Sequence, residues 1–124
     1  MRKWVLAAAM VAAMPVAASA ADAEAGKTVF NKCKACHQIG EGAKNAVGPH
    51  LDGVIGRKAG AAEGFNYSDA LKNSGITWDE ANFKAYIEDP KKKIPGNKMV
   101  FMGLKNPDDR DNLFEYLKSQ SPAK

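Results

Sequence analysis

The segment Cys-Lys-Ala-Cys-His, from Cys33 to His37, contains the only two cysteines of this 124-residue chain and one of its two histidines. Thiol and imidazole groups bind metals, exchange disulfides and form thioether links, so they are side chains that can carry chemistry. Their concentration in one short segment indicates that they share one task. Three kinds of site use cysteines at this spacing: a redox-active dithiol, a zinc site and a covalently attached haem.

A pairing of the two cysteines explains the segment poorly. A disulfide between Cys33 and Cys36 would close too short a loop to restrain the unfolded chain much. A redox-active dithiol is expected at the start of a helix that follows a strand. Here Gly26, Val29 and Phe30 recur at helical spacing just before the pair, which places the cysteines at the end of a helix.

Zinc is the second alternative, with Cys33, Cys36, His37 and His50 as conceivable ligands, but adjacent Cys36 and His37 do not match the usual spacing of zinc ligands. The pattern C-x-x-C-H is instead that of covalent haem attachment, in which two thiols form thioethers and the histidine offers its imidazole to the iron. We therefore predict one covalently bound haem c per chain, attached through Cys33 and Cys36, with His37 as an axial ligand.

The ligand on the other face of the iron sets the redox behaviour. Candidates outside residues Cys33 to His37, called here the attachment segment, are His50, Met99, Met102 and the lysines. A thioether is a soft ligand that favours ferrous iron and raises the reduction potential, whereas a second imidazole lowers it. The residue types alone leave this choice open.

Residues 1–20 have the features of a cleaved signal peptide: two basic residues near the start, an apolar stretch, and small residues before Ala21. A membrane anchor is the alternative, but the apolar run is short for a span and is interrupted by Pro15. We therefore predict export to the periplasm, one domain over residues 21–124, and no embedding in a membrane.

Charge argues against one class of partner. The formal net charge is +4 for the whole chain and becomes +2 without residues 1–20, which carry two basic residues and no acidic one. So small an excess gives no reason to expect nucleic acid as a partner.

The pattern after residue 21 predicts helices and loops, with no hairpin signal. A glycine-rich stretch between the first two helices is predicted to be a long irregular loop, which would need something to wrap. We expect a first helix at about Asp22 to Lys34 and a second one that is capped by Ser68 and ends before Gly75. A third helix should open with a capping box from Thr77 to Glu80, carry Phe83, Tyr86 and Ile87 on one face, and stop at Pro90. The last helix should be capped by Asn106, begin with Pro107, and bury Leu113, Phe114 and Leu117.

From Gly26 to Lys118 the sequence resembles the small monohaem class I cytochromes c, which include mitochondrial cytochrome c and its bacterial periplasmic counterparts. The resemblance rests on the ordered segments GKTVFNKCKACH, GPHLDGVIGRKAG, GFNYSDALKNSGITWDE, YIEDPKKKIPGNKMVFMGLK and DNLFEYLK. It implies the all-α cytochrome c fold, in which the N- and C-terminal helices pack together and short helices and loops wrap one covalent haem.

The resemblance also implies residue roles. Met99 matches the distal iron ligand, opposite His37; Met102 is then expected to pack, and His50 to be a surface or loop-bonding residue. In the remaining haem pocket, Pro49 matches the proline whose carbonyl accepts from the proximal imidazole, Tyr86 a tyrosine near the methionine sulfur, and Arg57, Tyr67 and Trp78 residues around a buried propionate. The match also places Gly26 and Phe30 against Leu113 and Tyr116, at the seam of the terminal helices.

Two residues depart from the family pattern. Asn97 stands where threonine is common, which puts an amide in place of a hydroxyl beside a propionate. Leu71 stands where mitochondrial members carry asparagine, so an apolar side chain replaces a polar one on the distal side.

The implied function is that of a one-electron carrier, not an enzyme, that shuttles electrons between membrane redox complexes of respiratory or photosynthetic chains, as a monomer. Cytochrome c reductase, cytochrome c oxidase or a photosynthetic reaction centre would be the partners. They would meet a lysine-rich face made of Lys32, Lys34, Lys91, Lys92, Lys93, Lys98 and Lys105, which would steer acidic surfaces toward the haem edge. A haem peroxidase or gas sensor and a haem-free thiol oxidoreductase are the other function classes considered.

Overall fold

The computed structural model describes residues 21–120 of the chain, so the predicted signal peptide lies outside the described residues. Within this range the chain forms helices and loops without a strand, and Lys58 and Thr77 make an isolated antiparallel bridge. The all-α prediction is confirmed for this part of the chain. The elements are α1 (Ala23–Val29), the 3₁₀ helix η1 (Phe30–Lys32), α2 (Asp69–Lys72), α3 (Glu80–Glu88), α4 (Pro90–Lys93) and α5 (Pro107–Ser119).

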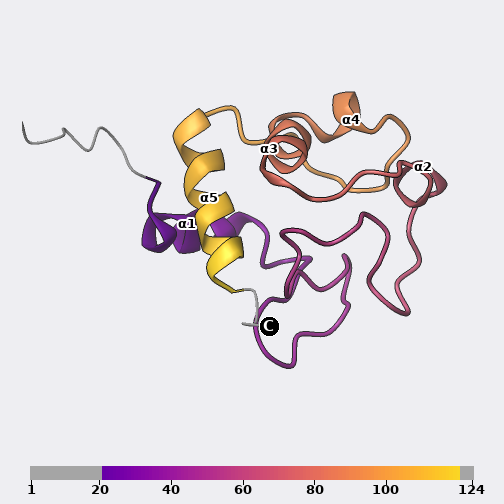
Figure 1. Ribbon diagram of the computed structural model, residues 1–124, viewed down its shortest axis with the longest axis horizontal. Helices are drawn as coiled ribbons and strands as arrows, with labels where there is room; N and C mark the ends of the chain where they lie inside the picture. The colour runs from indigo at the N-terminus through magenta and orange to yellow at the C-terminus, as the bar shows by residue number, and fades with distance from the viewer. Residues whose placement is uncertain (1–20, 121–124) are drawn as a thin grey trace, which may run out of the picture.

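The two terminal helices, α1 and α5, cross each other (Figure 1). Their approach is close at Gly26, where any side chain would run into the backbone of Asn112 and the Cβ of Tyr116. Next to this crossing the rings of Phe30 and Tyr116 lie 5.5 Å apart. Leu113 and Leu117 are buried on the same seam, as the sequence predicted.

Most helix starts are where the sequence places them. The side chains of Ser68 and Asn106 accept from the backbone N–H groups of Leu71 and Asp108, so they cap α2 and α5. The capping box expected at Thr77 is wrong: Asp79 caps α3 by accepting from Asn82. The carbonyl of Trp78, which would accept an intrahelical bond if the helix began at Thr77, instead accepts from Gly56 N–H at 2.8 Å, so the helix begins only after Asp79.

The long segment between η1 and α2 is irregular, as predicted, but it is tied at several points to the rest of the chain. Gly48 N–H donates to Cys36 O at 2.7 Å, and Leu51 N–H donates to Gln38 O at 2.9 Å. Further along, the N–H of Trp78 donates to Arg57 O at 2.9 Å. These bonds satisfy backbone groups that regular structure would otherwise satisfy, and they fix the loop.

A second irregular segment, residues 94–106, joins α4 to α5. Leu104 in this segment is buried, whereas Met102 is 87% exposed and Val100 97% exposed. The expectation that Met102 packs is therefore wrong. The segment is held at Leu104, whose N–H donates to Ile87 O at 2.8 Å, and Met102, two residues earlier, projects to the outside.

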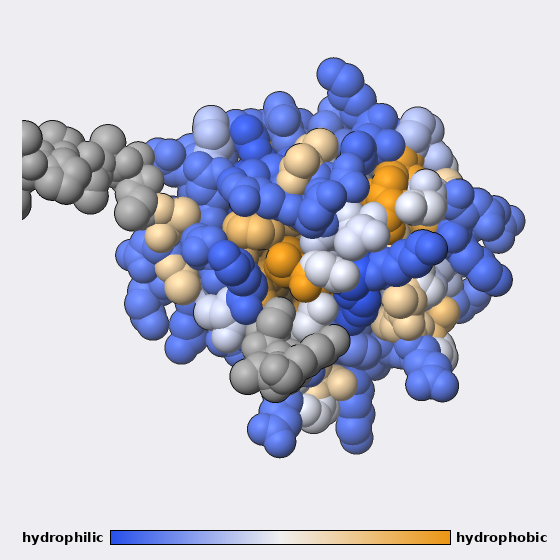
Figure 2. Space-filling view, viewed as in Figure 1, coloured by the Kyte–Doolittle hydropathy of each residue, from blue (hydrophilic) through white to orange (hydrophobic). Residues whose placement is uncertain are grey.

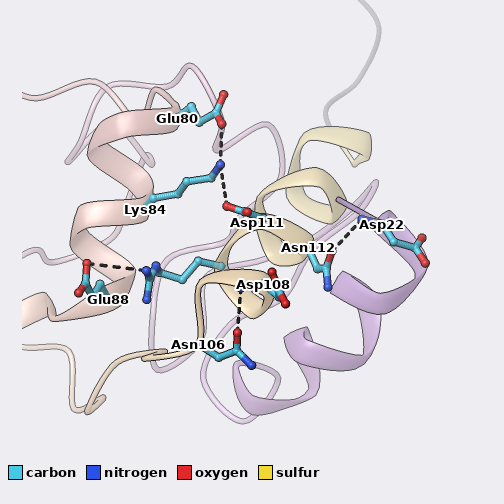
Figure 3. A network of polar contacts seen from close by, with 9 residues as sticks. Asp22, Glu80, Lys84, Glu88, Asn106, Asp108, Asp111 and Asn112 are labelled. Carbon is cyan, nitrogen blue, oxygen red and sulfur yellow. Dashed lines mark hydrogen bonds and ion pairs between the residues drawn. The ribbon is translucent and has the colours of Figure 1, made fainter. Parts of the chain in front are cut away.

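Helices α3 and α5 are linked by polar side chains (Figure 3). The ammonium of Lys84 on α3 lies 2.5 Å from Glu80 and 2.9 Å from Asp111 of α5. Arg110 of α5 lies 4.0 Å from Glu88 of α3 and donates to Leu104 O at 2.7 Å. Exposed ion pairs contribute little to stability, so these links mainly fix how the two helices face each other. No helix in residues 21–120 has the length and the apolar composition that crossing a membrane requires.

The helix crossing generates a stability prediction. Alanine in place of glycine within a helix normally stabilises it by about 0.5–1 kcal/mol, whereas overfilling a packed contact costs about 1–3 kcal/mol. Because the Gly26 position has no room for a methyl group, Gly26→Ala should lower the free energy of unfolding, measured by urea titration. The control Thr28→Ala, on the exposed side of α1, should change it by less than about 0.5 kcal/mol. Equal effects of the two substitutions would contradict the close crossing.

Candidate functional site

A cavity of about 350 Å³ lies inside the molecule, with a predominantly apolar lining that comes from η1, α2, α3, α5 and both irregular segments. Figure 2 shows apolar residues gathered across the middle of one face, surrounded by hydrophilic ones. All nine residues that the sequence analysis assigned to the site line the cavity, namely Cys33, Cys36, His37, Pro49, Arg57, Tyr67, Trp78, Tyr86 and Met99. His50 and Met102 are not among the lining residues.

The attachment segment forms one turn of chain directly after η1. The N–H groups of Cys36 and His37 both donate to Cys33 O, at 3.1 and 2.9 Å. This turn presents both sulfurs and the imidazole to one cavity. The two cysteines form no disulfide with each other, and burial, with the Cys36 thiol as a second cause, raises the pKa of the Cys33 thiol to about 11. A redox-active dithiol needs a thiolate near neutral pH, so this environment does not favour thiol oxidoreductase chemistry.

The His37 ring is held by backbone. Its Nδ1 donates to the carbonyl oxygen of Pro49 at 2.8 Å, which directs Nε2 away from the loop. Burial lowers the pKa of His37, although the bond to Pro49 opposes the shift. A neutral imidazole with a free ring nitrogen is the form that binds a metal. Within residues 21–120, no three His, Cys, Asp or Glu side chains lie together as zinc ligands would.

Gly48 contributes to this arrangement in a way that the sequence analysis missed. A Cβ at this position would collide with the His37 ring, so the loop backbone packs directly on the imidazole. No local pattern marks this position, because a close backbone approach depends on the turn geometry that the folded chain adopts.

On another wall of the cavity, Arg57 donates through its two terminal nitrogens to the carbonyl oxygens of Asp52 and His50, at 3.1 and 2.9 Å. Its Nε is buried and has no partner among residues 21–120. A buried cationic donor normally has an acceptor, and a carboxylate is the strongest one. Tyr67, on the same side, accepts from Ala62 N–H at 2.8 Å. The wall therefore offers a donor to an anionic group inside an otherwise apolar cavity.

The remaining predicted residues are Met99, Tyr86 and Trp78, all of which line the cavity. The hydroxyl of Tyr86 lies 3.9 Å from the Met99 sulfur, and the Tyr86 and Trp78 rings are 4.9 Å apart. Burial raises the pKa of Tyr86 to about 12, so this hydroxyl stays protonated and can donate to the sulfur. His50, by contrast, takes part in the loop through its backbone, since its N–H donates to Asn45 Oδ1 at 3.0 Å.

Comparison with known proteins decides the family. The family described as Cytochrome c matches residues 23–121. The chain belongs to the cytochrome c family. It is 66% identical over 98 residues to cytochrome c2 of Rhodoblastus acidophilus, and the alignment covers 79% of this chain and 92% of the relative. It is 65% identical over 96 residues to cytochrome c-550 of Nitrobacter winogradskyi, covering 77% and 88%.

A solved structure gives the same result for the fold. Cytochrome cH from Methylobacterium extorquens superposes with a TM-score of 0.75 at 55% identity, covering 79% of this chain and 98% of the other. The predicted cytochrome c fold is therefore confirmed. Membership of the family establishes that the chain is an electron carrier with one covalent haem c, and that it is not an enzyme.

The residues present fit this cofactor. A haem is a large apolar ring with two carboxylate side chains and an iron that binds imidazole and thioether ligands. The cavity supplies an apolar lining, thiols, an oriented imidazole and a thioether. It also supplies the unpartnered Nε of Arg57, which suits a carboxylate.

The packing of Gly48 on the imidazole can be tested. Gly48→Ala should push the His37 ring out of position, lower the unfolding free energy by about 1–3 kcal/mol and reduce the haem content of the purified protein. Thermal unfolding and the ratio of haem to protein absorbance measure these effects. Gly42→Ala is the control, because Gly42 has a left-handed φ of 81° but no neighbour within 4 Å, so it should cost stability without changing haem content. Full haem content in Gly48→Ala would contradict the role of Gly48.

Proposed function

We propose that this chain carries single electrons with a haem c that Cys33 and Cys36 attach covalently and whose iron is bound by His37 on one face and Met99 on the other. The observation that carries the proposal is the 2.8 Å bond from His37 Nδ1 to Pro49 O inside a cavity that Met99 also lines. That bond supports a proximal ligand role, because metal-binding histidines usually donate their second N–H to a carbonyl or carboxylate.

Met99 is the best-supported distal ligand among the candidates that the sequence left open. It lines the cavity, and its sulfur lies beside the Tyr86 hydroxyl. Met102 is 87% exposed, and neither Met102 nor His50 lines the cavity.

The mechanism follows from what the side chains hold in place. When bound, the haem supplies an iron that alternates between the ferric and ferrous states. His37 and Met99 would both hold the iron, through an imidazole and a thioether, which disfavours substrate binding and oxygen chemistry. Pro49 keeps the imidazole in one orientation, the hydroxyl of Tyr86 would donate to the Met99 sulfur, and Arg57 would donate to a carboxylate. Because these groups are fixed before any electron moves, little rearrangement accompanies the change of charge.

We also propose that residues 1–20 are a signal peptide cleaved before Ala21, and that the domain of residues 21–124 acts in the periplasm as a monomer. Its partners would be membrane redox complexes: a cytochrome c reductase, and an oxidase or a photosynthetic reaction centre. The lysine-rich face supports this, since all seven of its lysines are exposed, and Lys32 and Lys98 lie at the cavity. Such a face attracts acidic surfaces and forms brief, salt-sensitive contacts.

The ligand assignment is tested by optical spectra of the haem-bearing protein. The ferric wild type should show the weak far-red band of a sulfur–iron bond. Met99→Ala should abolish the band, because no other side chain of the cavity offers a thioether, and Met102→Ala should keep it. A haem-bearing wild type without the band, or one whose ferric form binds cyanide at once, would support the peroxidase or sensor alternative instead.

The partner proposal is tested by the salt dependence of electron transfer to a purified oxidase or reductase. The rate should fall roughly tenfold or more between about 0.01 M and 0.1 M ionic strength, as the screening length shortens from about 30 Å to about 10 Å. Lys32→Gln should slow transfer at low salt. Lys27→Gln, an exposed lysine on α1 that does not line the cavity, is the matched control and should have a smaller effect. A rate that does not respond to salt would refute the role of the lysine-rich face.

A further inference from the structure

Asn97 is a buried polar side chain two positions before Met99, with 5% of its surface exposed. Its Nδ2 donates to the carbonyl oxygens of Pro90 and Ile94, each at 2.8 Å. Its Oδ1 accepts from the backbone N–H of Met99 at 2.9 Å. Since all three partners are backbone groups of fixed polarity, the orientation of the amide is determined, and both of its N–H donors are used.

The backbone around Asn97 is fixed as well. Asn97 N–H donates to Ile94 O at 3.2 Å, and Gly96 has a φ of 90°, so Pro95 and Gly96 occupy the centre of a turn that requires glycine at its third position. The ammonium of Lys91 donates to Asn97 O at 2.6 Å. Asn97 is therefore bonded through its backbone N–H, its carbonyl and its side chain.

The chain on the other side of Met99 is differently placed. Val100 and Met102 are 97% and 87% exposed, and the segment is tied to α3 at Leu104. Met99 thus lies directly after a rigid turn and just before a stretch in which Val100 and Met102 are exposed and Phe101 packs against the core. The bond from Met99 N–H to Asn97 Oδ1 joins the methionine to the rigid side.

We propose that Asn97 is a positioning residue that holds Met99 at the haem iron. This inference rests on the proposed ligation by His37 and Met99. The amide does not serve as a substitute for a hydroxyl beside a propionate, because its donors are used on Pro90 and Ile94. It transmits the geometry of the turn after α4 to the backbone of the distal ligand.

Loss of this anchor has a measurable consequence. A ferric protein in which Met99 leaves the iron can take up added imidazole, so the apparent imidazole affinity rises with the fraction of molecules in which Met99 is detached. The loss of one hydrogen bond shifts the equilibrium between attached and detached Met99 by a small factor, and leaving its buried partners unsatisfied shifts this equilibrium further. Losing three side-chain bonds at Asn97 should increase the apparent affinity by about tenfold or more.

The experiment titrates imidazole into four ferric, haem-bearing proteins while the far-red band is followed: wild type, Asn97→Ala, Asn97→Thr and Asn45→Ala. Asn97→Ala should bind imidazole about tenfold more tightly than the wild type or better. Asn97→Thr should be intermediate, because one hydroxyl can accept from Met99 and donate to a single carbonyl. Asn45→Ala should match the wild type. It is the matched control, since Asn45 also makes two side-chain bonds to backbone, with Glu63 O at 2.9 Å and His50 N–H at 3.0 Å, in the loop on the Pro49 side.

Urea unfolding of the same proteins separates positioning from general stability. An Asn97→Ala protein that loses stability but keeps the wild-type imidazole affinity and far-red band would overturn the proposal. If Asn97→Ala yields no haem-bearing protein, Asn97→Thr carries the test, and wild-type affinity there would overturn it. A wild type without the far-red band would overturn the proposed ligation and the role of Asn97 together, whereas a normal wild type with an unaltered Asn97→Ala refutes the role of Asn97 alone.

Discussion

The central cavity of about 350 Å³ is the constraint on which the rest of this structure depends. A chain of this size buries a limited share of its surface and has few side chains to spare for a second core. Phe30, Leu113 and Leu117 therefore do two things: they are buried at the crossing of α1 and α5, and they line the cavity. The crossing of the terminal helices and the haem pocket consequently form one apolar unit, which an apolar cofactor completes. Anything that separates α1 from α5 also opens a wall of the site.

That constraint explains how a site made largely of irregular chain can be rigid. The loop that carries Pro49 is bonded through Gly48 N–H to Cys36 O, within the attachment segment itself. The segment that carries Arg57 is paired with the stretch around Trp78, just before α3. Each loop is thus fixed by bonds to a neighbour that also lines the cavity, so the polar groups of the backbone are satisfied and the side chains are directed inward in the same step.

The parts of this arrangement that sequence could predict are those with a local chemical cause. The cysteine and histidine spacing predicts the cofactor, and Ser68, Asn106 and Pro107 mark helix starts, because a cap depends on residues within a few positions. The cap predicted at Thr77 was wrong because Thr77 is paired with Lys58, in a loop about twenty residues earlier. The packing predicted for Met102 was wrong because Leu104 is the residue buried in the segment of residues 94–106. The contacts of Gly48 and Asn97 were hidden for a related reason: a close approach or a side-chain bond to a distant carbonyl depends on the turn geometry that the folded chain adopts.

The two proposed iron ligands, His37 and Met99, are held by different means, and the difference matches their chemistry. Imidazole is a strong ligand of iron in both oxidation states, and His37 needs mainly orientation, which Pro49 O and the backbone of Gly48 supply. A thioether is neutral and soft, and it binds ferric iron less well than ferrous iron. The contact from Tyr86 to the Met99 sulfur, at 3.9 Å, is weak. If Met99 binds the iron as proposed, backbone placement would have to keep it there, and the turn that ends at Asn97, which bonds to Met99 N–H, would supply that placement. With that ligation, changes in this turn would act on the ferric state more than on the ferrous state, so the turn could adjust the reduction potential while the His37 side stays unchanged.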